Sequence, residues 1–167
     1  MYYNGIYIDH KTKEMCIDFG QNQRCPKLVY IKEAVERVDT YKYLGVVFDS
    51  KFNWKENINS VLKKVNSRMY CIRKLRSFGV NSDMLVTFYN AVICSIIMFG
   101  SVCWDGNISE LDRGRLEKIV KKAGHVVGKP LDSFKTLHEK RLYRKLMRIL
   151  NDPTHPVRHY FDSRRSN

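Results

Sequence analysis

Hydrophobic residues alternate with polar ones over short stretches in residues 1–50 and recur at helical spacing from Trp54 onward. Alternation among aromatic and β-branched residues is typical of strands, whereas the later pattern is typical of amphipathic helices. The last stretch before the change, Tyr41–Phe48, predicts a strand. Gly45 interrupts it, which indicates a β-bulge or the close approach of another backbone. We therefore predict an α+β fold, with a small antiparallel β unit over about residues 1–50 followed by a bundle of about four helices.

Residues 1–50 contain several further strand patterns. Met1–Ile8, Met15–Phe19 and Leu28–Ile31 each predict a short strand. Gly20–Pro26 predicts a loop from its content of Gln, Asn and Pro. Val35–Phe48 predicts one or two strands and is best interpreted as a hairpin.

The first long helix is predicted from Trp54 to Phe78. Asn53 can cap it, and Glu56 three residues later completes a pair resembling a capping box. Its predicted apolar face consists of Trp54, Ile58, Val61, Leu62, Val65, Met69 and Ile72.

No charged residue occurs from Met84 to Trp104, so a membrane span has to be weighed against a core helix. Thr, Tyr, Asn, Ser and Gly residues dilute the run, and its flanks lack the charge pattern of a membrane span. We predict a second helix that Ser82 caps and that is buried on all sides, and we expect no membrane partner.

Two more amphipathic helices follow, one capped by Ser109 and ended by Gly128–Pro130, the other over about Asp132–Leu150. Their predicted apolar faces are Leu111, Leu116, Ile119, Val120, Ala123 and Val127 in the third helix, and Phe134, Leu137, Leu142, Leu146, Ile149 and Leu150 in the fourth. Their predicted outward residues are Arg113, Arg115, Lys118, Lys121 and Lys122 in the third helix, and Lys135, Lys140, Arg141, Arg144, Lys145 and Arg148 in the fourth.

The chain carries 30 Lys and Arg against 17 Asp and Glu, a formal net charge of +13. Charges balance within residues 1–50, so the whole excess lies in the predicted helical domain, residues 51–151, and in a basic tail at 152–167. A basic helical surface beside a neutral strand unit favours sequence-independent binding to the phosphate backbone of RNA or of an RNA–DNA duplex. The alternatives are a solubilising surface, a calmodulin target or a helix lying on a membrane.

The sequence contains few motifs that are typical of catalytic sites, metal sites or disulfide frameworks. Its five cysteines are scattered and form no C-x-x-C pair, which argues against a disulfide framework and against zinc. With no signal-peptide pattern at the start, this predicts a reducing intracellular compartment, nuclear or cytoplasmic. Metal-binding, phosphate-loop and nucleophile motifs do not occur, and the aspartates of residues 1–50 stand singly, whereas two-metal catalysis needs clustered carboxylates. We expect no catalytic residue, no metal site and no cofactor.

Five short sequence motifs follow one another along the chain: K-T-K-E-M (Lys11–Met15), V-E-R-V-D-T-Y-K-Y-L-G-V (Val35–Val46), S-R-M-Y (Ser67–Tyr70), R-K-L-R-S-F (Arg73–Phe78) and V-C-W (Val102–Trp104). Together they resemble the C-terminal part of the reverse transcriptase of LINE-type, non-LTR retrotransposons. The resemblance implies that the K-T segment closes the palm, that the Y-K-Y-L-G strand pair forms the primer grip, and that the helices form the thumb.

The resemblance also implies roles for single residues. Tyr43, Leu44 and Gly45 would lie near the primer terminus, and Lys11 would match a palm lysine that aids pyrophosphate departure. The basic thumb residues expected to hold the template–primer backbone are Lys63, Lys64, Arg68, Arg73 and Lys74. The family's catalytic aspartate pair lies upstream of the K-T segment, where Ile8–His10 departs from the family pattern. We therefore expect a truncated remnant without DNA polymerase activity, or alternatively a structural relic without function.

Segments of this kind are also grouped under a family named for the N-terminal region of AlkB homologue 8. That name implies tRNA wobble-uridine modification by methyl transfer and by iron/2-oxoglutarate hydroxylation. The H-x-D motif and the glycine-rich loop that these activities need are both missing from the sequence. By this resemblance, the chain is expected to be an accessory segment beside such catalytic domains.

Overall fold

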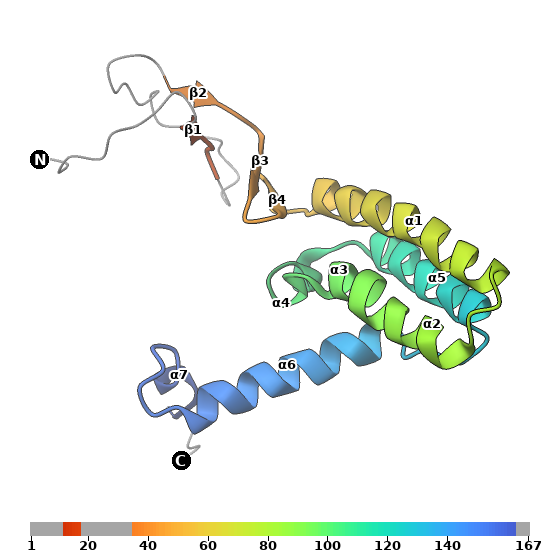
Figure 1. Ribbon diagram of the computed structural model, residues 1–167. Coiled ribbons are helices and arrows are strands. Elements are labelled where there is room, and N and C mark those ends of the chain that lie inside the picture. Colours follow the sequence, from red (N-terminus) through yellow and green to blue (C-terminus); the bar gives the residue numbers. More distant parts are fainter. Residues whose placement is uncertain (1–11, 18–34, 163–167) are drawn as a thin grey trace, which may run out of the picture.

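The computed structural model describes residues 12–17 and 35–162 of the chain. Two short strand pairs precede the helices (Figure 1): β1 (Lys13–Glu14) pairs in parallel with β2 (Glu36–Arg37), and β3 (Thr40–Tyr43) pairs antiparallel with β4 (Val46–Asp49). The helical elements are α1 (Lys55–Ser77), α2 (Ser82–Phe88), the π-helical η1 (Tyr89–Cys94), α3 (Ser95–Met98), α4 (Ser101–Trp104), the 3-10 helix η2 (Asp105–Asn107), α5 (Glu110–Val127), α6 (Phe134–Asn151) and α7 (His159–Asp162). The predicted α+β class is confirmed.

The N-terminal strands are shorter than the sequence predicts. Two of the predicted strands and the predicted loop between them lie outside the described residues. The strand predicted at Met15–Phe19 is wrong over its described part, because the observed strand is the two residues before it. Charged side chains join this strand to β2, since Lys13 pairs with Glu36, and Glu14 accepts a hydrogen bond from Arg37 (2.7 Å). The parallel pairing also differs from the antiparallel unit that the sequence predicts.

Strands β3 and β4 form the expected hairpin. Its two-residue turn is Leu44–Gly45, and both residues have positive φ angles, 46° and 89°. Such a type I′ turn matches the twist of the two strands. Gly45 is therefore a turn residue and not a bulge within one strand. The predicted close approach of another backbone is wrong as well, because the group near Gly45 is a side chain: a Cβ on Gly45 would lie 3.3 Å from Cε1 of Phe99.

Asp49, the last residue of β4, organises the entry to α1. Its buried carboxylate accepts hydrogen bonds from the backbone N–H groups of Lys51 (3.1 Å), Asn53 (3.2 Å) and Trp54 (2.9 Å). Trp54 occupies the cap position of α1 with a φ of 63°, and it makes no side-chain cap bond. The predicted capping box of Asn53 and Glu56 is therefore wrong. The turn around Asp49 displaces the cap by one residue, and the Asn53 side chain instead accepts from the N–H two residues on (3.0 Å).

A second buried polar group and an aromatic cluster hold the hairpin on the helices. Asn57 of α1 is buried, and its Oδ1 accepts a hydrogen bond from the N–H of Val47 in β4 (3.1 Å). The rings of Phe48, Phe52 and Trp54 pack around this junction, with centroids 5.3 to 6.0 Å apart. The hairpin is thus fixed against the first turn of α1.

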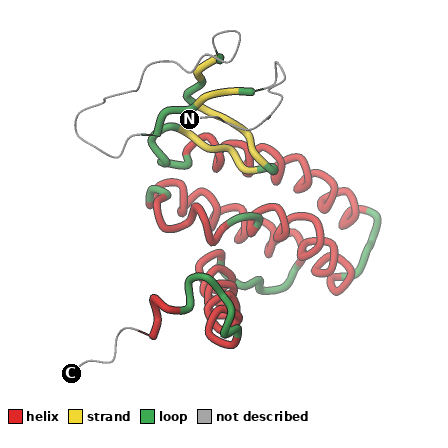
Figure 2. The backbone as a smooth tube through the Cα atoms, turned by 90° about the vertical axis from the view of Figure 1, so that its left-hand side faces the viewer, coloured by secondary structure: helices red, strands yellow, loops and turns green. Residues whose placement is uncertain are grey.

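Three helical segments form the core: α1, the continuous helix α2–η1–α3 (Ser82–Met98) and α5 (Figures 1 and 2). Every residue of the predicted apolar face of α1 is buried, which confirms that prediction. Helices α1 and α5 run in the same direction. Near their starts, Arg115 donates from Nη2 to Oδ1 of Asn59 (3.0 Å), and at their ends Arg76 lies beside Gly128.

The predicted faces of α5 are correct with three exceptions. Leu111 is 77% exposed rather than buried. The two arginines of its first half are half-buried rather than outward, because each has an acidic partner within the bundle. Arg113 pairs with Asp105 and Arg115 pairs with Asp112, each at 2.7 Å. The serine cap of α5 is confirmed.

The helix Ser82–Met98, which has no charged residue after Asp83, is only half-buried. Its cap is Asn81, one residue before the predicted cap, and the Asn81 Oδ1 accepts from the N–H three residues on (2.9 Å). The helix ends at Phe99–Gly100, where Gly100 has a φ of 65°. Met84 is 63% exposed and Phe99 53% exposed, so the prediction of burial on all sides is wrong. Helices α1 and α5 cover one side of this helix, and its other side faces solvent.

By length and composition, Ser82–Asn107 is a segment that could cross a membrane. Its unbroken part, Ser82–Met98, spans roughly 25 Å at the α-helical rise per residue. This is short of the roughly 30 Å of hydrocarbon in a bilayer. One side of the helix also packs against α1 and α5. We therefore retain the interpretation of a helix that contributes to the core.

Helix α6 begins against the core. Phe134 is fully buried and stacks on Trp104, with ring centroids 5.9 Å apart and planes 3° from parallel. The carboxylate of Glu117 in α5 accepts hydrogen bonds from the first two N–H groups of α6 (3.2 and 3.0 Å). One turn further on, the buried His138 places Nε2 3.2 Å from Oδ2 of Asp105. These contacts fix the direction of α6.

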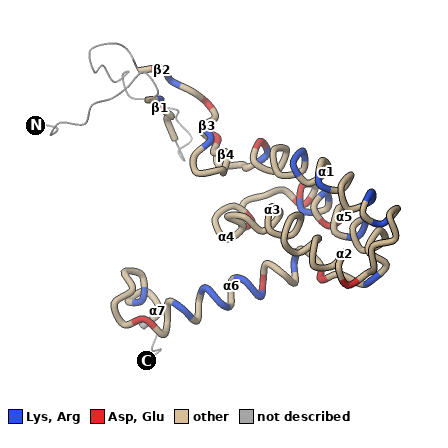
Figure 3. The backbone as a smooth tube through the Cα atoms, viewed as in Figure 1, with Lys and Arg blue, Asp and Glu red and all other residues tan. Residues whose placement is uncertain are grey.

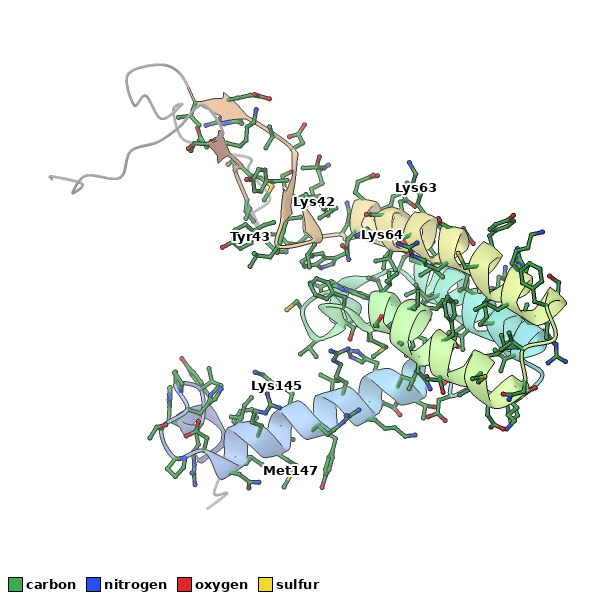
Figure 4. All side chains as sticks on the ribbon, in the orientation of Figure 1. Lys42, Tyr43, Lys63, Lys64, Lys145 and Met147 are labelled. Carbon is green, nitrogen blue, oxygen red and sulfur yellow. The ribbon has the colours of Figure 1, made fainter. Side chains whose placement is uncertain are left out.

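The second half of α6 extends away from the core (Figure 1). The predicted burial of its apolar face is confirmed for Phe134 and wrong for Leu142, which is 41% exposed. The other residues of that face are half-buried: Leu137, Leu146, Ile149 and Leu150. In Figure 4, Lys145 and Met147 lie on opposite sides of the ribbon, with Lys145 on the side of α2 and α3. The basic side of this half of α6 therefore faces the bundle. This part of the helix lies beyond the end of the apolar core.

Candidate nucleic-acid interface

Among the predicted site residues, Lys11 lies outside the described part of the chain. The others fall into two groups, one at the tip of the β3–β4 hairpin and one along α1: Tyr43, Leu44 and Gly45, and Lys63, Lys64, Arg68, Arg73 and Lys74.

The hairpin tip presents exposed apolar side chains beside a cation. Tyr43 is 58% exposed and Leu44 77% exposed. Behind the turn, Gly45 lines a pocket of about 360 Å³ together with Phe99 of the bundle and Lys64 of α1. The structure thus brings the hairpin turn and Lys64 together. Exposed aromatic rings next to a cation are groups that can stack on nucleic-acid bases and contact phosphates.

The five predicted cations of α1 are all exposed. Helical spacing places Lys63 and Lys74 opposite the buried face, and Arg73 on one flank of that face. Lys64 lies on the flank toward α3, where it lines a pocket with Ser95 and Ile96 (Figure 4). Helical spacing places Arg68 one turn further along the same flank. Arg73 and Lys74 are roughly 15 Å further along the axis than Lys63. The structure therefore does not bring them to the hairpin tip. The five cations are spread along α1 and over its exposed sides, and we call this basic surface the strip.

Acidic partners are scarce along this strip. Helix α1 carries seven basic residues and one acidic residue (Figure 3). Within residues 12–17 and 35–162, none of the five cations forms an ion pair. The ion pairs of the helical part engage other cations: Arg113, Arg115, Lys129, Lys135, Lys140 and, with Asp105, His138. Lys74 instead lies 6.0 Å from the ring centroid of the exposed Tyr70. Unpaired exposed cations are the groups that neutralise phosphates.

A second cationic site lies between α6 and the helix Ser82–Met98. We call it the α6 pocket. It is an open pocket of about 480 Å³, lined by Asn90, Cys94, Ser95, Met98, Val102, Leu137, Arg141, Arg144, Lys145 and Arg148. Four of these residues are cations from α6, and none is acidic. Arg141 is held in place by a hydrogen bond from Nη1 to the carbonyl oxygen of Met98 (2.7 Å).

The sequence predicts the four pocket cations only as part of a solvated polar face. Their spacing does predict that they lie together, because side chains three and four positions apart share one side of a helix, as do Arg141, Arg144, Lys145 and Arg148. The spacing does not predict the opposite wall of the pocket, which is formed by a helix about fifty residues earlier in the chain.

Neither site contains groups poised for acid–base or metal chemistry. Burial raises the pKa of the Cys94 thiol in the α6 pocket, and the opposing effect of Arg141 is smaller. The thiol is therefore a poor nucleophile there. Within the described ranges, no three His, Cys, Asp or Glu side chains gather into a metal-binding group. What both sites share is a set of exposed cations without ion-pair partners in the described part of the chain.

The family described as alkylated DNA repair protein alkB homolog 8, N-terminal, matches residues 54–95. The matched stretch starts at Trp54 and covers α1, the following loop, α2 and η1, so it includes all five α1 cations. It is less than half of the chain, and the similarity is a similarity of this helical hairpin. No curated protein and no solved structure matches the chain significantly.

Proposed function

We propose that this protein binds the phosphate backbone of RNA, or of an RNA–DNA duplex, through α1 and performs no chemistry on it. The observation that carries the proposal is the strip of exposed α1 cations without ion-pair partners in the described part of the chain. Contacts to phosphates do not select a sequence, so the binding is sequence-independent. A nucleic-acid partner in a reducing intracellular compartment fits the net charge of +13 and the scattered cysteines.

Two origins of such a module are compatible with the proposal. The match over residues 54–95 supports an accessory segment of an AlkB homologue 8-like tRNA-modifying protein, because the matched hairpin is the one that carries the cations. The remnant of a reverse transcriptase has no support among the comparisons and rests on the sequence resemblance alone. For that origin, the exposed Tyr43 and Leu44 are the residues to test.

The test is fluorescence anisotropy with a labelled RNA hairpin and a recessed RNA–DNA primer–template at several salt concentrations. The test variant combines Lys63→Gln, Arg73→Gln and Lys74→Gln. The matched control combines Lys129→Gln, Lys135→Gln and Lys140→Gln, three exposed cations that are paired with acids. Both variants lose the same charge.

If α1 contacts phosphates, the slope of log K against log salt falls by about 2 to 3 in the test variant and by much less in the control. Equal weakening by both variants would mean that net charge alone attracts nucleic acid. No binding by the folded protein at low salt would leave the solubilising surface as the explanation of the charge.

The two origins are separated by two further assays. Addition of the purified protein to a catalytic fragment of AlkB homologue 8 is expected to raise wobble-uridine modification of tRNA if the accessory origin is right. Preference for the recessed primer end, lost in Tyr43→Ala with Leu44→Ala, would instead support the reverse-transcriptase origin. In either case we expect no primer extension with metal ions and nucleotides.

A further inference from the structure

The cations of α6 divide into two kinds. Lys135 pairs with Glu139 at 4.0 Å, and Lys140 pairs with Asp132 at 2.7 Å. The remaining four form no ion pair within the described part of the chain, and these are the four that line the α6 pocket: Arg141, Arg144, Lys145 and Arg148. The unpaired cations of this helix therefore collect on one wall of a pocket.

The four pocket cations are unfavourable neighbours without an anion. They stand at spacings of three and four residues, where like charges on a helix repel each other. The opposite wall offers Asn90, Cys94 and Ser95, which carry no charge that could relieve this. An anion between the walls would convert the repulsion into attraction.

The guanidinium groups are oriented before any ligand arrives. Arg141 donates from Nη1 to the Met98 carbonyl (2.7 Å), and Arg144 donates from Nε to the Lys140 carbonyl (3.3 Å). Each bond uses one donor and leaves the rest of the planar fork free. Free guanidinium donors in a fixed plane match the oxygens of a phosphate group.

The pocket also has an apolar side. Met98, Val102 and Leu137 line it, and Met98 is only 5% exposed. A volume of about 480 Å³ is within the range of small-molecule sites. Four cations suit a terminal phosphate, which carries close to two charges, better than a single bridging phosphodiester. The apolar side matches the face of a nucleobase.

We propose that the α6 pocket binds a nucleoside monophosphate, with the phosphate on the α6 cations and the base against Met98, Val102 and Leu137. The ligand is either a free nucleotide or the phosphorylated end of an RNA or DNA strand. The site does not depend on the proposed function of α1, because it uses none of the α1 cations.

The test is isothermal titration calorimetry of the whole protein with adenosine 5′-monophosphate, adenosine and inorganic phosphate. The nucleotide is expected to bind at least about tenfold more tightly than either of its parts, because only the nucleotide engages both sides of the pocket. Equal binding of inorganic phosphate would overturn the base contact, and equal binding of adenosine would overturn the phosphate contact. Binding to vesicles containing anionic lipid but not to the nucleotide would overturn the proposal.

Variants locate the site. Arg144→Gln with Arg148→Gln is expected to weaken nucleotide binding at least about tenfold, whereas Lys135→Gln with Lys140→Gln on the same helix changes it less than about twofold. Equal losses in both variants would overturn the proposal. Because burial raises the pKa of the Cys94 thiol, alkylation is followed at alkaline pH, and protection of Cys94 by the nucleotide, located by peptide mass mapping, is an independent readout of the pocket that this thiol lines. Absence of protection at saturating nucleotide would place the ligand elsewhere.

The source of the ligand is decided with short RNA and DNA strands. A 5′-phosphorylated tetranucleotide that binds more tightly than its 5′-hydroxyl counterpart, with the loss confined to the Arg144 and Arg148 variant, identifies a strand end. Equal binding of the two strands together with tight mononucleotide binding identifies a free nucleotide. Failure of this site would leave the salt dependence of the α1 variant unchanged, so the two proposals can fail separately.

Discussion

Replacing Asp49 by alanine should loosen the joint between the hairpin and the helical bundle. This carboxylate is 8% exposed and accepts three backbone N–H groups at 2.9 to 3.2 Å. The shortest of these bonds comes from Trp54, which has the left-handed conformation that starts α1 and is itself 3% exposed. No other described side chain accepts these three hydrogen bonds. The substitution therefore acts on one junction without removing apolar contacts.

The expected loss of unfolding free energy follows from the exposure of the donors. A hydrogen bond to a charged acceptor contributes about 1.5 to 3 kcal/mol, and the buried N–H of Trp54 should lose all of it. The N–H groups of Lys51 and Asn53 belong to exposed residues, so water can replace their acceptor at a loss of roughly 0.5 kcal/mol each. We expect Asp49→Ala to cost about 3 kcal/mol and Asp49→Asn about half as much, since the amide keeps one acceptor oxygen.

Urea unfolding monitored by far-UV circular dichroism and tryptophan fluorescence measures this loss. Asp39→Ala is the matched control, because Asp39 is an exposed aspartate at the same end of the hairpin, and its backbone carbonyl rather than its side chain accepts the N–H of Ser50 (2.9 Å). The control should change the unfolding free energy by less than about 0.5 kcal/mol. If Asp49→Ala were no more destabilising than the control, the joint would not depend on this carboxylate, and the account of how α1 begins would be wrong.

Three further changes test other parts of the structure. Leu44→Asn should stabilise the hairpin by about 0.5 to 1 kcal/mol in urea unfolding, because asparagine tolerates the left-handed conformation that leucine does not, and a loss would contradict the type I′ turn. His138→Ala should cost about 2 to 3 kcal/mol, because it removes a partner of the buried Asp105 and a ring that stacks on Phe134, whereas a neutral result would show that Asp105 needs only its arginine. Burial raises the pKa of Tyr89, so the stability of the native protein is fully present below about pH 10, the ordinary tyrosine value, and is lost as the pH rises beyond it. In Tyr89→Phe that alkaline loss, followed by urea midpoints from pH 8 to pH 11, should be smaller, and identical profiles would contradict the assignment.

The helical part of the fold could be predicted from the sequence because one face of each helix meets the core. Spacing alone identified every buried apolar residue of α1 and of α5, although it also placed the exposed Leu111 on the buried face. Helix caps were less predictable. The sequence around Asn53 fits a capping box, but the carboxylate of Asp49 holds the backbone in another conformation, and a contact of that kind is not visible in local propensity.

The candidate site was predictable on α1 and not on α6. On α1 the cations lie outside the apolar face, so the sequence alone predicts that they are exposed. On α6 the same kind of amphipathic pattern predicts an apolar face toward the core. The stacking of Phe134 on Trp104 and the contact of His138 with Asp105 set the direction of the helix, and that direction turns its basic side toward the bundle. These are tertiary contacts between residues of two separate elements, and no pattern within α6 contains them.

Folding places many of the acidic side chains away from the unpaired cations, and both proposals rest on this distribution. Most acidic side chains of the helical part have structural duties: Asp105 and Asp112 bind arginines of α5, Glu117 caps α6, and Asp83 and Asp132 pair with surface lysines. These interactions hold the carboxylates at the ends of helices and between neighbouring helices. The acids are then not available to the cations of α1 or to those in the second half of α6. A random scatter of the same excess charge would give a uniformly basic surface that only keeps the protein soluble, whereas the observed distribution leaves one exposed strip and one lined pocket as the places where an anion gains most.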